Sequence, residues 1–151
     1  MKLFLKRLTF INSWLIAIAT FVTVSCSDQT IHSGALTLSS SPNSLSEDFP
    51  SDLIYENSKI RTYGMLDTGG FWSPAQYAIL AESNDESNNI ITHYLTTLQK
   101  QNWQILQSRY FEKDKKTVLV AESLFKQTVT IVVVDQNPTT IKLFLKRSSD
   151  E

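Results

Sequence analysis

The chain of 151 residues has little cysteine, histidine or glycine, and each shortage excludes a class of protein. A single cysteine forms neither an intramolecular disulfide nor a zinc site built from thiolates. With two histidines, no Ser/His/Asp or Cys/His catalytic arrangement is recognisable. The four glycines are spaced as neither a Walker loop nor a G-x-G-x-x-G motif. We therefore predict no catalytic residue, no cofactor and no metal site.

The charge of the chain gives no reason to expect nucleic acid as a partner. The formal net charge is −1, whereas nucleic-acid binding usually needs a basic face or stripe. Residues 26–151 carry 11 basic and 15 acidic side chains, so the part beyond the first segment is mildly acidic. Hydrophobic residues make up 42% of the chain, which is too apolar for a fully disordered protein and enough for one domain.

Residues 1–25 have the composition of a secretory signal peptide. Lys2, Lys6 and Arg7 are followed by an apolar stretch that ends at Val24, before the small residue Ser25. A basic start, an apolar middle and small residues at the end define such signals. The alternative is an uncleaved membrane helix, although the stretch from Leu8 to Val24 is at the lower limit of length for a span. In both cases the remainder of the chain crosses the membrane.

The segment Val22–Cys26 resembles the lipobox of bacterial lipoproteins. Val24, Ser25 and Cys26 match the lipobox pattern, and Thr23 stands where leucine is usual. The resemblance implies cleavage between Ser25 and Cys26, acylation of the Cys26 thiol, and a lipid anchor in the membrane on the extracytoplasmic side of the bacterial cell envelope. It leaves the inner and the outer membrane both open. The alternative is an ordinary signal peptide cut after Ser25, which leaves a free cysteine.

Residues 26–48 contain the lipidated cysteine and what we interpret as a flexible tether. The stretch from Ser27 to Asp48 is rich in serine, and such a segment buries too little apolar surface to offset the entropy of ordering it. Within it, the short piece Ala35–Leu38 has the alternation of a strand, and pairing with a sheet edge is the alternative for that piece.

Residues 49–151 form the predicted domain, a small α+β fold with a single helix packed on an antiparallel β-meander. Its expected order is β-β-α-β-β-β-β. Period-two alternation and β-branched residues predict six strands. These strands are Lys59–Tyr63, Gln76–Glu82, Trp103–Phe111, Thr117–Ser123, Thr128–Val134 and Thr140–Lys146. In the last strand, Leu143 and Leu145 alternate with Lys142, Phe144 and Lys146, as expected for a strand with one buried face.

The helix is the most strongly indicated element. Ile90, Tyr94 and Leu98 recur at helical spacing and form an apolar stripe. Ser83, Asp85 and Ser87 are candidates for the N-cap. Asn102 is the expected left-handed terminator, and Trp103 is expected in the core between the helix and the sheet.

A second resemblance concerns the whole predicted domain. The sequence has Pro50 before Leu53-Ile54-Tyr55, then His93-Tyr94 on the helix and Asn102-Trp103 at its end. This pattern is similar to small bacterial envelope lipoprotein domains of helix-grip-like layout, comparable to accessory lipoproteins of the outer-membrane β-barrel assembly machinery. Most such domains are uncharacterised, so the resemblance implies a fold and no active site.

The candidate binding surface is the loop that contains Gly69, Gly70, Phe71 and Trp72, where large rings lie on a pliable segment. The alternative is that Trp72 folds back to cap the core. We therefore expect a membrane-anchored envelope lipoprotein with a non-enzymatic interaction or scaffolding role, which binds an envelope protein through this loop or a sheet face. The alternative function is an extracytoplasmic small-ligand binder or a hydrolase that uses the singly scattered carboxylates.

Overall fold

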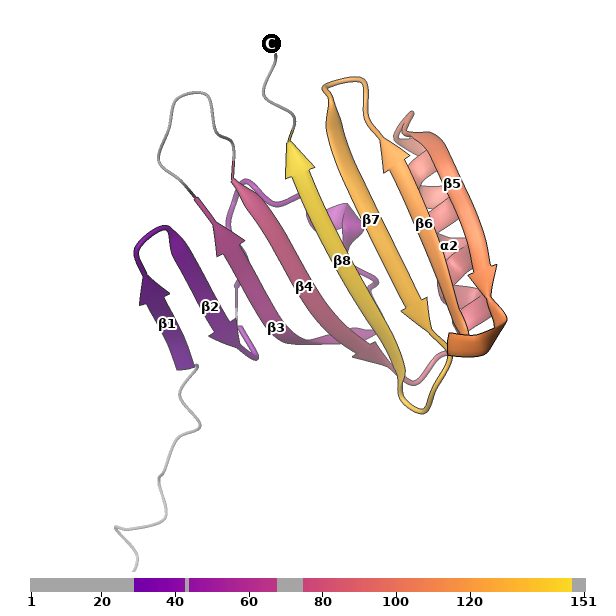
Figure 1. The fold of residues 1–151 in the computed structure, drawn as a ribbon, viewed down its shortest axis with the longest axis horizontal. Helices are drawn as coiled ribbons and strands as arrows, with labels where there is room; N and C mark the ends of the chain where they lie inside the picture. The colour runs from indigo at the N-terminus through magenta and orange to yellow at the C-terminus, as the bar shows by residue number, and fades with distance from the viewer. Residues whose placement is uncertain (1–28, 43, 68–74, 148–151) are drawn as a thin grey trace, which may run out of the picture.

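The computed structural model describes residues 29–42, 44–67 and 75–147, which form one antiparallel sheet of eight strands with one α-helix (Figure 1). The predicted α+β class is therefore confirmed. The strands are β1 (Gln29–Ser33), β2 (Leu36–Ser40), β3 (Ser58–Leu66), β4 (Gln76–Ser83), β5 (Gln104–Phe111), β6 (Lys116–Glu122), β7 (Gln127–Val134) and β8 (Thr139–Arg147). The helices are α2 (Ser87–Lys100) and the 3-10 turns η1 (Ser51–Leu53) and η2 (Glu112–Asp114).

The sheet is made of two up-and-down runs that meet at its centre. The strand order is β1-β2-β3-β4-β8-β7-β6-β5, so the last strand of each run, β4 and β8, pair with each other. The connection from β4 to β5, which contains α2, crosses from the centre of the sheet to its far edge. From β3 onward the elements follow the predicted order, although the strands do not form a single meander, because β8 returns to β4.

The predicted order is wrong at its beginning, where the structure has two further strands. β1 and β2 form a hairpin, and β2 pairs with β3, within the segment interpreted as a flexible tether. The serine-rich composition of this segment predicted no order, but composition does not take its pairing partner into account. Leu36 and Leu38 lie opposite Leu66 and Gly64 of β3, a strand that is already held in the sheet. Backbone hydrogen bonding to an existing edge supplies order that an isolated serine-rich segment lacks.

The hydrophobic core lies on one face of the sheet. Figure 1 shows α2 behind β5 and β6, and α2 contacts β5, β7 and η1. The chain that joins β2 to β3 passes behind the same face and adds Phe49, Leu53 and Tyr55 to the core. The helix therefore covers only part of the face that we expected it to cover alone. The largest fully buried side chains are Tyr94, Leu53, Ile90, Leu98, Leu119, Ile131, Ile141, Leu143, Val129 and Val133.

The C-terminal end of α2 has the predicted left-handed residue. Asn102 has a φ of 59°, the Trp103 N–H donates to the Leu98 carbonyl, and the Asn102 N–H donates to the Gln99 carbonyl. These two bonds define a Schellman motif, which satisfies carbonyls that the helix itself leaves unpaired. Trp103 is buried, as predicted.

The N-terminal end of α2 differs from the prediction. Glu86 occupies the N-cap position, and no side chain caps the helix. Asp85 is not available as a cap because its carboxylate accepts hydrogen bonds from Tyr55 and Asn57. The Ser83 hydroxyl donates to the Asn57 carbonyl and accepts from the Asp85 N–H.

Candidate functional site

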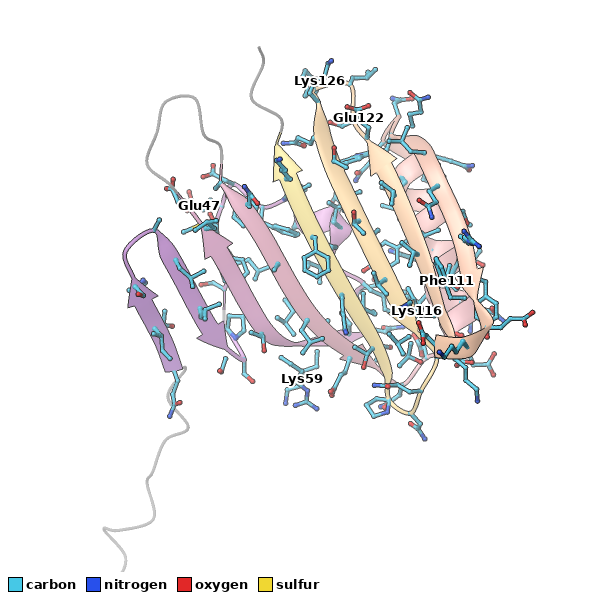
Figure 2. All side chains as sticks on the ribbon, viewed as in Figure 1. Glu47, Lys59, Phe111, Lys116, Glu122 and Lys126 are labelled. Carbon is cyan, nitrogen blue, oxygen red and sulfur yellow. The ribbon has the colours of Figure 1, made fainter. Side chains whose placement is uncertain are left out.

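The second face of the sheet has no helix over it within the described residues, and it is the face toward the viewer in Figures 1 and 2. Strand pairing places Ile31, Leu38, Gly64, Ala78 and Phe144 opposite one another in turn, so they form one continuous apolar row across β1, β2, β3, β4 and β8. We call this surface the open face. The row results from the period-two alternation of the strands, because the alternate residues point into the core.

The large apolar side chains of the row are exposed. Ile31 is 63% exposed and Phe144 is 48% exposed, and Leu36 and Leu66 in the neighbouring row are each 37% exposed. Leu36, Leu66 and Phe144 border an apolar hollow of about 250 Å³. The lining residues include Leu36, Leu38, Gly64, Leu66, Ala78 and Phe144.

Gly64 determines the shape of this hollow. A Cβ atom at Gly64 would lie 3.2 Å from Cδ2 of Leu38, closer than ordinary van der Waals contact. The Leu38 side chain therefore leans over the β3 backbone at the one position of the row that lacks a side chain. This leaves the space between Leu38 and Phe144 open.

Basic side chains lie beside the row. Lys142 and Lys146 flank Phe144 on β8, and neither forms an ion pair within the part of the chain that the structure describes. At the other margin of the face, Arg109 lies 5.0 Å and Lys116 5.5 Å from the centre of the Phe111 ring. Figure 2 shows Phe111 and Lys116 at this margin. The face thus combines exposed apolar side chains with cations.

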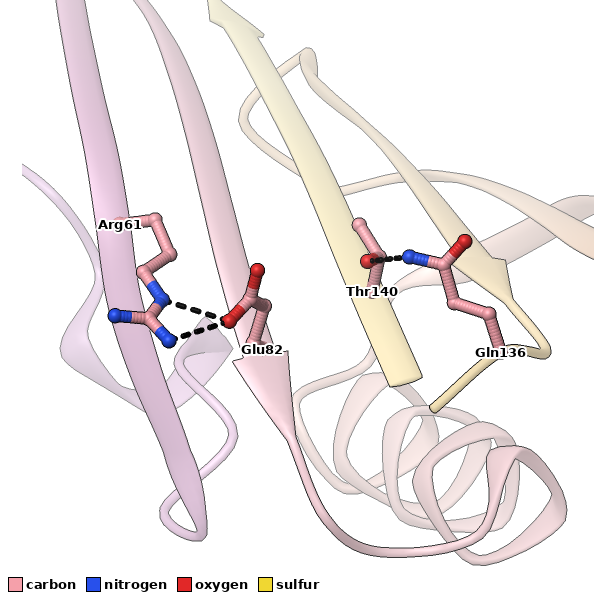
Figure 3. A network of polar contacts seen from close by, with 4 residues as sticks. All are labelled: Arg61, Glu82, Gln136 and Thr140. Atoms are coloured by element: carbon pink, nitrogen blue, oxygen red, sulfur yellow. Dashed lines mark hydrogen bonds and ion pairs between the residues drawn. The ribbon is translucent and has the colours of Figure 1, made fainter. Parts of the chain in front are cut away.

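Two polar contacts lie near the end of the face where β8 begins (Figure 3). Arg61 and Glu82 form an ion pair of 2.7 Å between β3 and β4, and the Gln136 amide donates to the Thr140 hydroxyl. Because the side chains of Arg61 and Glu82 are partly exposed, at 45% and 29%, the ion pair contributes little to stability. It does neutralise the Glu82 carboxylate on a face that is otherwise rich in cations.

A separate polar cluster joins the start of α2 to the chain before β3. The Tyr55 hydroxyl donates to Asp85 Oδ2 at 2.6 Å, and Asn57 Nδ2 donates to the same oxygen at 3.0 Å. The hydrogen bond from Tyr55, followed by that from Asn57, holds the pKa of Asp85 below its ordinary value. The same bond to Asp85 raises the pKa of the Tyr55 hydroxyl, with burial as a second cause. Asp85 is therefore an ionised acceptor that connects two elements.

A polar hollow of about 440 Å³ lies beside this cluster. It is lined by residues of the connection from β4 to α2 and of the turn from β7 to β8, including Asp85, Glu86 and Asp135. This hollow is where the structure brings carboxylates together, as the carboxylate alternative would require. The Asp85 carboxylate is already held by two donors, so it is poorly placed to act on a ligand.

All the residues of the predicted site lie outside the described residues. These are Ser25 and Cys26 at the predicted cleavage site, and Gly69, Gly70, Phe71 and Trp72 in the predicted binding loop. Leu66 and Gln76, which flank that loop, pair with each other next to Leu36 and Lys146. The loop therefore begins and ends beside the open face.

The two histidines have structural contacts. His32 Nδ1 lies 3.0 Å from the Thr37 hydroxyl across the β1–β2 hairpin. The His93 ring makes an edge contact with Tyr55 at 4.9 Å. Within the described ranges, no group of three or more His, Cys, Asp or Glu residues is arranged to hold a metal ion. In the same ranges, no helix combines the length and the apolar character needed to cross a membrane.

Sequence reasoning identified the alternation in β8 but not the continuity of the apolar row. The exposed position of Phe144 follows from its place between Lys142 and Lys146, whereas its alignment with Leu38 and Ile31 depends on the pairing of β4 with β8 and on the β1–β2 hairpin. Comparison of the chain with family models, with curated proteins and with solved structures finds no match.

Proposed function

We propose that the chain is a lipoprotein of the bacterial envelope, anchored through acyl chains on Cys26, whose domain acts by non-enzymatic binding through the open face. The observation that carries this proposal is the apolar row from Ile31 to Phe144, which remains exposed although the other face of the same sheet is covered. Contiguous exposed apolar side chains with polar neighbours are typical of interaction surfaces.

The position of β1 supports the anchored role. Only Ser27 and Asp28 separate Cys26 from Gln29, the first residue of β1. Three peptide steps span at most about 11 Å, so a lipid on Cys26 would hold the edge of the sheet close to the membrane surface. Two or more acyl chains give a stable anchor where a single chain gives reversible binding. The domain would thus work at the membrane and not at the end of a long tether.

The carboxylate alternative is less well supported. The polar hollow near α2 contains Asp85, Glu86 and Asp135, but Asp85 serves to join Tyr55 and Asn57 to the start of the helix. Binding through the open face needs no free carboxylate. The proposal therefore rests on the open face and not on the polar hollow.

Mass spectrometry of the mature N-terminus tests the anchor. We expect the mature chain to begin at Cys26 and to carry at least two acyl chains, and we expect Cys26→Ala to abolish both cleavage and acylation. The matched variant Ser27→Ala should be processed normally. An unmodified N-terminal residue other than Cys26 in the native chain would contradict the proposal.

Co-purification from detergent-solubilised envelope tests the open face. Leu38→Asp places a charge in the apolar row, and we expect the set of envelope components that co-purify with the chain to shrink. Leu106→Asp is the matched control because Leu106 is also exposed, on β5 at the far edge of the sheet. If both variants retain the same components as the native chain, the open face is not a protein-binding surface.

A further inference from the structure

We propose that the partner of the open face is the lipid surface: the face lies against a bilayer with anionic headgroups, with its apolar row toward the lipid and its lysines at the headgroups. This inference rests on the proposed function, because it assumes that the chain is held at the membrane through Cys26. It names what covers the face and how the domain is oriented.

The first argument is the continuity of the apolar row with the edge of the sheet that carries the anchor. Ile31 lies in β1, close after Gln29, and it is the most exposed of the large apolar side chains in the row. The row then crosses the sheet through Leu38 to Phe144 without a charged residue. A lipid on Cys26 therefore brings the beginning of this row within reach of the bilayer before any other part of the face.

The second argument is the charge of the face, which is opposite in sign to that of the chain. Residues 26–151 contain more acidic than basic side chains. On the open face, strand pairing places more basic than acidic residues. They are Lys59, Arg109, Lys116, Lys142 and Lys146, against Glu82 and Glu122. Arg61 neutralises Glu82, while Asp114 pairs with Lys116.

The lysines of β8 stand where headgroups would meet the protein. Lys142 and Lys146 lie on either side of Phe144, on the same face of the strand, and both are exposed. A lysine stem is long enough to lie along apolar surface while its amine reaches the headgroups. A surface that buries apolar side chains in the interface and presents lysine to phosphate matches an anionic membrane. A protein partner would have to supply both an apolar strip and acidic side chains at the same spacing.

The short connection to Cys26 makes this contact an intramolecular event. Once the acyl chains are in the bilayer, the open face is confined to a thin layer next to the bilayer surface. Its effective concentration there is high, so even a weak contact is formed most of the time. A long tether would dilute this effect. The β1–β2 hairpin thus contributes to orientation as well as to the sheet.

The experiment uses the full acylated chain in vesicles of phosphatidylethanolamine and phosphatidylglycerol. An environment-sensitive fluorophore is attached to Gln76→Cys, which lines the hollow on the open face, or to Gln99→Cys, which is exposed on α2. Acylated Cys26 does not react with the label. We expect nitroxide-bearing lipids to quench the label at position 76, and dissolved iodide to quench the label at position 99.

Charge reversal tests the role of the lysines. We expect Lys142→Glu with Lys146→Glu to abolish lipid quenching at position 76, and we expect high salt or purely zwitterionic vesicles to reduce it. The matched control is Lys100→Glu with Lys113→Glu, which makes the same charge change on α2 and η2 and should have no effect. Circular dichroism of each variant establishes that the sheet is intact.

Each outcome has a defined meaning. If Cys26 is acylated and the label at position 76 is as accessible to iodide as the label at position 99, the inference is overturned and the face is free for a protein partner. If Cys26 carries no lipid, the proposed function fails. Sedimentation of the chain with anionic vesicles then tests the face alone: loss of binding on Lys142→Glu with Lys146→Glu supports the contact, and no binding by the native chain overturns it.

Discussion

Hydrogen bonds of single side chains join segments that are far apart in the sequence. Tyr55 and Asn57, on the chain that leads into β3, both donate to Asp85, just before α2. Thr139 at the start of β8 donates to the Asp85 carbonyl at 2.8 Å. One residue thus connects three elements, which explains why Asp85 does not cap the helix.

The role of Asp85 predicts a dependence of stability on pH. Because its pKa is lowered in the folded protein, the ionised carboxylate stabilises the fold above its ordinary pKa of 3.8, and this contribution is lost as the pH falls through the lower, folded value. Asp85→Asn should therefore lower the melting temperature modestly at pH 7 and have progressively less effect below pH 3.8. Thermal melts across pH measure this difference. Asp135→Asn, with the same charge change, should not reproduce it.

Removal of the Tyr63 hydroxyl should not destabilise the protein, in contrast to removal of the Asp85 charge. The Tyr63 Oη is buried, and it has no hydrogen-bond partner of acceptable geometry among the described residues, although Ser46 lies near. Burial raises the pKa of this hydroxyl. Because an unpaired buried polar group costs about 1–3 kcal/mol, Tyr63→Phe should leave the free energy of unfolding unchanged or raise it by roughly 1 kcal/mol.

Urea unfolding of Tyr63→Phe measures this change. The control is Tyr55→Phe, which removes a hydroxyl that does donate to Asp85 and should lower stability. A loss of stability in Tyr63→Phe equal to that in Tyr55→Phe would show that the Tyr63 hydroxyl has a partner.

The local sequence pattern is sufficient to predict some elements of this fold and insufficient for others. The stripe of Ile90, Tyr94 and Leu98 was enough to predict α2, because a periodic apolar face and a left-handed Asn102 are properties of the segment itself. In the β1–β2 hairpin the local signal is limited to the brief alternation of Ala35–Leu38, which indicated pairing with a sheet edge only as an alternative. The order of the hairpin depends on β3, a partner that begins only at Ser58, well after β2 has ended at Ser40.

The hairpin turn gives a prediction at this scale. Gly34 has a φ of +60°, a backbone conformation that residues with a side chain rarely adopt, and no atom lies near enough to obstruct an added Cβ. Gly34→Val should therefore act through backbone strain, of about 1 kcal/mol or more, and loosen β1 from β2. Hydrogen exchange at the amides of β1 should become faster while exchange in β7 is unchanged. Ala35→Val, at the next turn position, should have little effect.

The whole molecule is a sheet with two unlike faces. One face is covered by α2 and by the chain between β2 and β3, and it buries Leu143 and Ile131 completely. The open face has the row from Ile31 to Phe144. The open face is a nearly continuous surface that begins at β1, the first strand after Cys26 in the sequence.

The distance between Cys26 and the sheet gives the prediction at this scale. Insertion of a long, flexible Gly/Ser segment between Asp28 and Gln29 should leave the melting temperature unchanged, because no described contact is altered. It should weaken the lipid contact of the open face, since the face is no longer confined near the bilayer. Lipid quenching of the label at Gln76→Cys in vesicles measures this loss. The same insertion within residues 148–151 is the control.

The sequence by itself determined the α+β class, the position of α2 and the strands from β3 to β8, because these depend on periodicity, β-propensity and a residue suited to the helix end. It also carried the lipobox-like Val22–Cys26, whose role remains a proposal. Only the tertiary structure decided that β1 and β2 belong to the sheet, that β4 pairs with β8, and that Ile31, Leu38 and Phe144 align. Those features are contacts between distant segments, and the free energy of pairing with an edge that is already formed cannot be read from either segment alone.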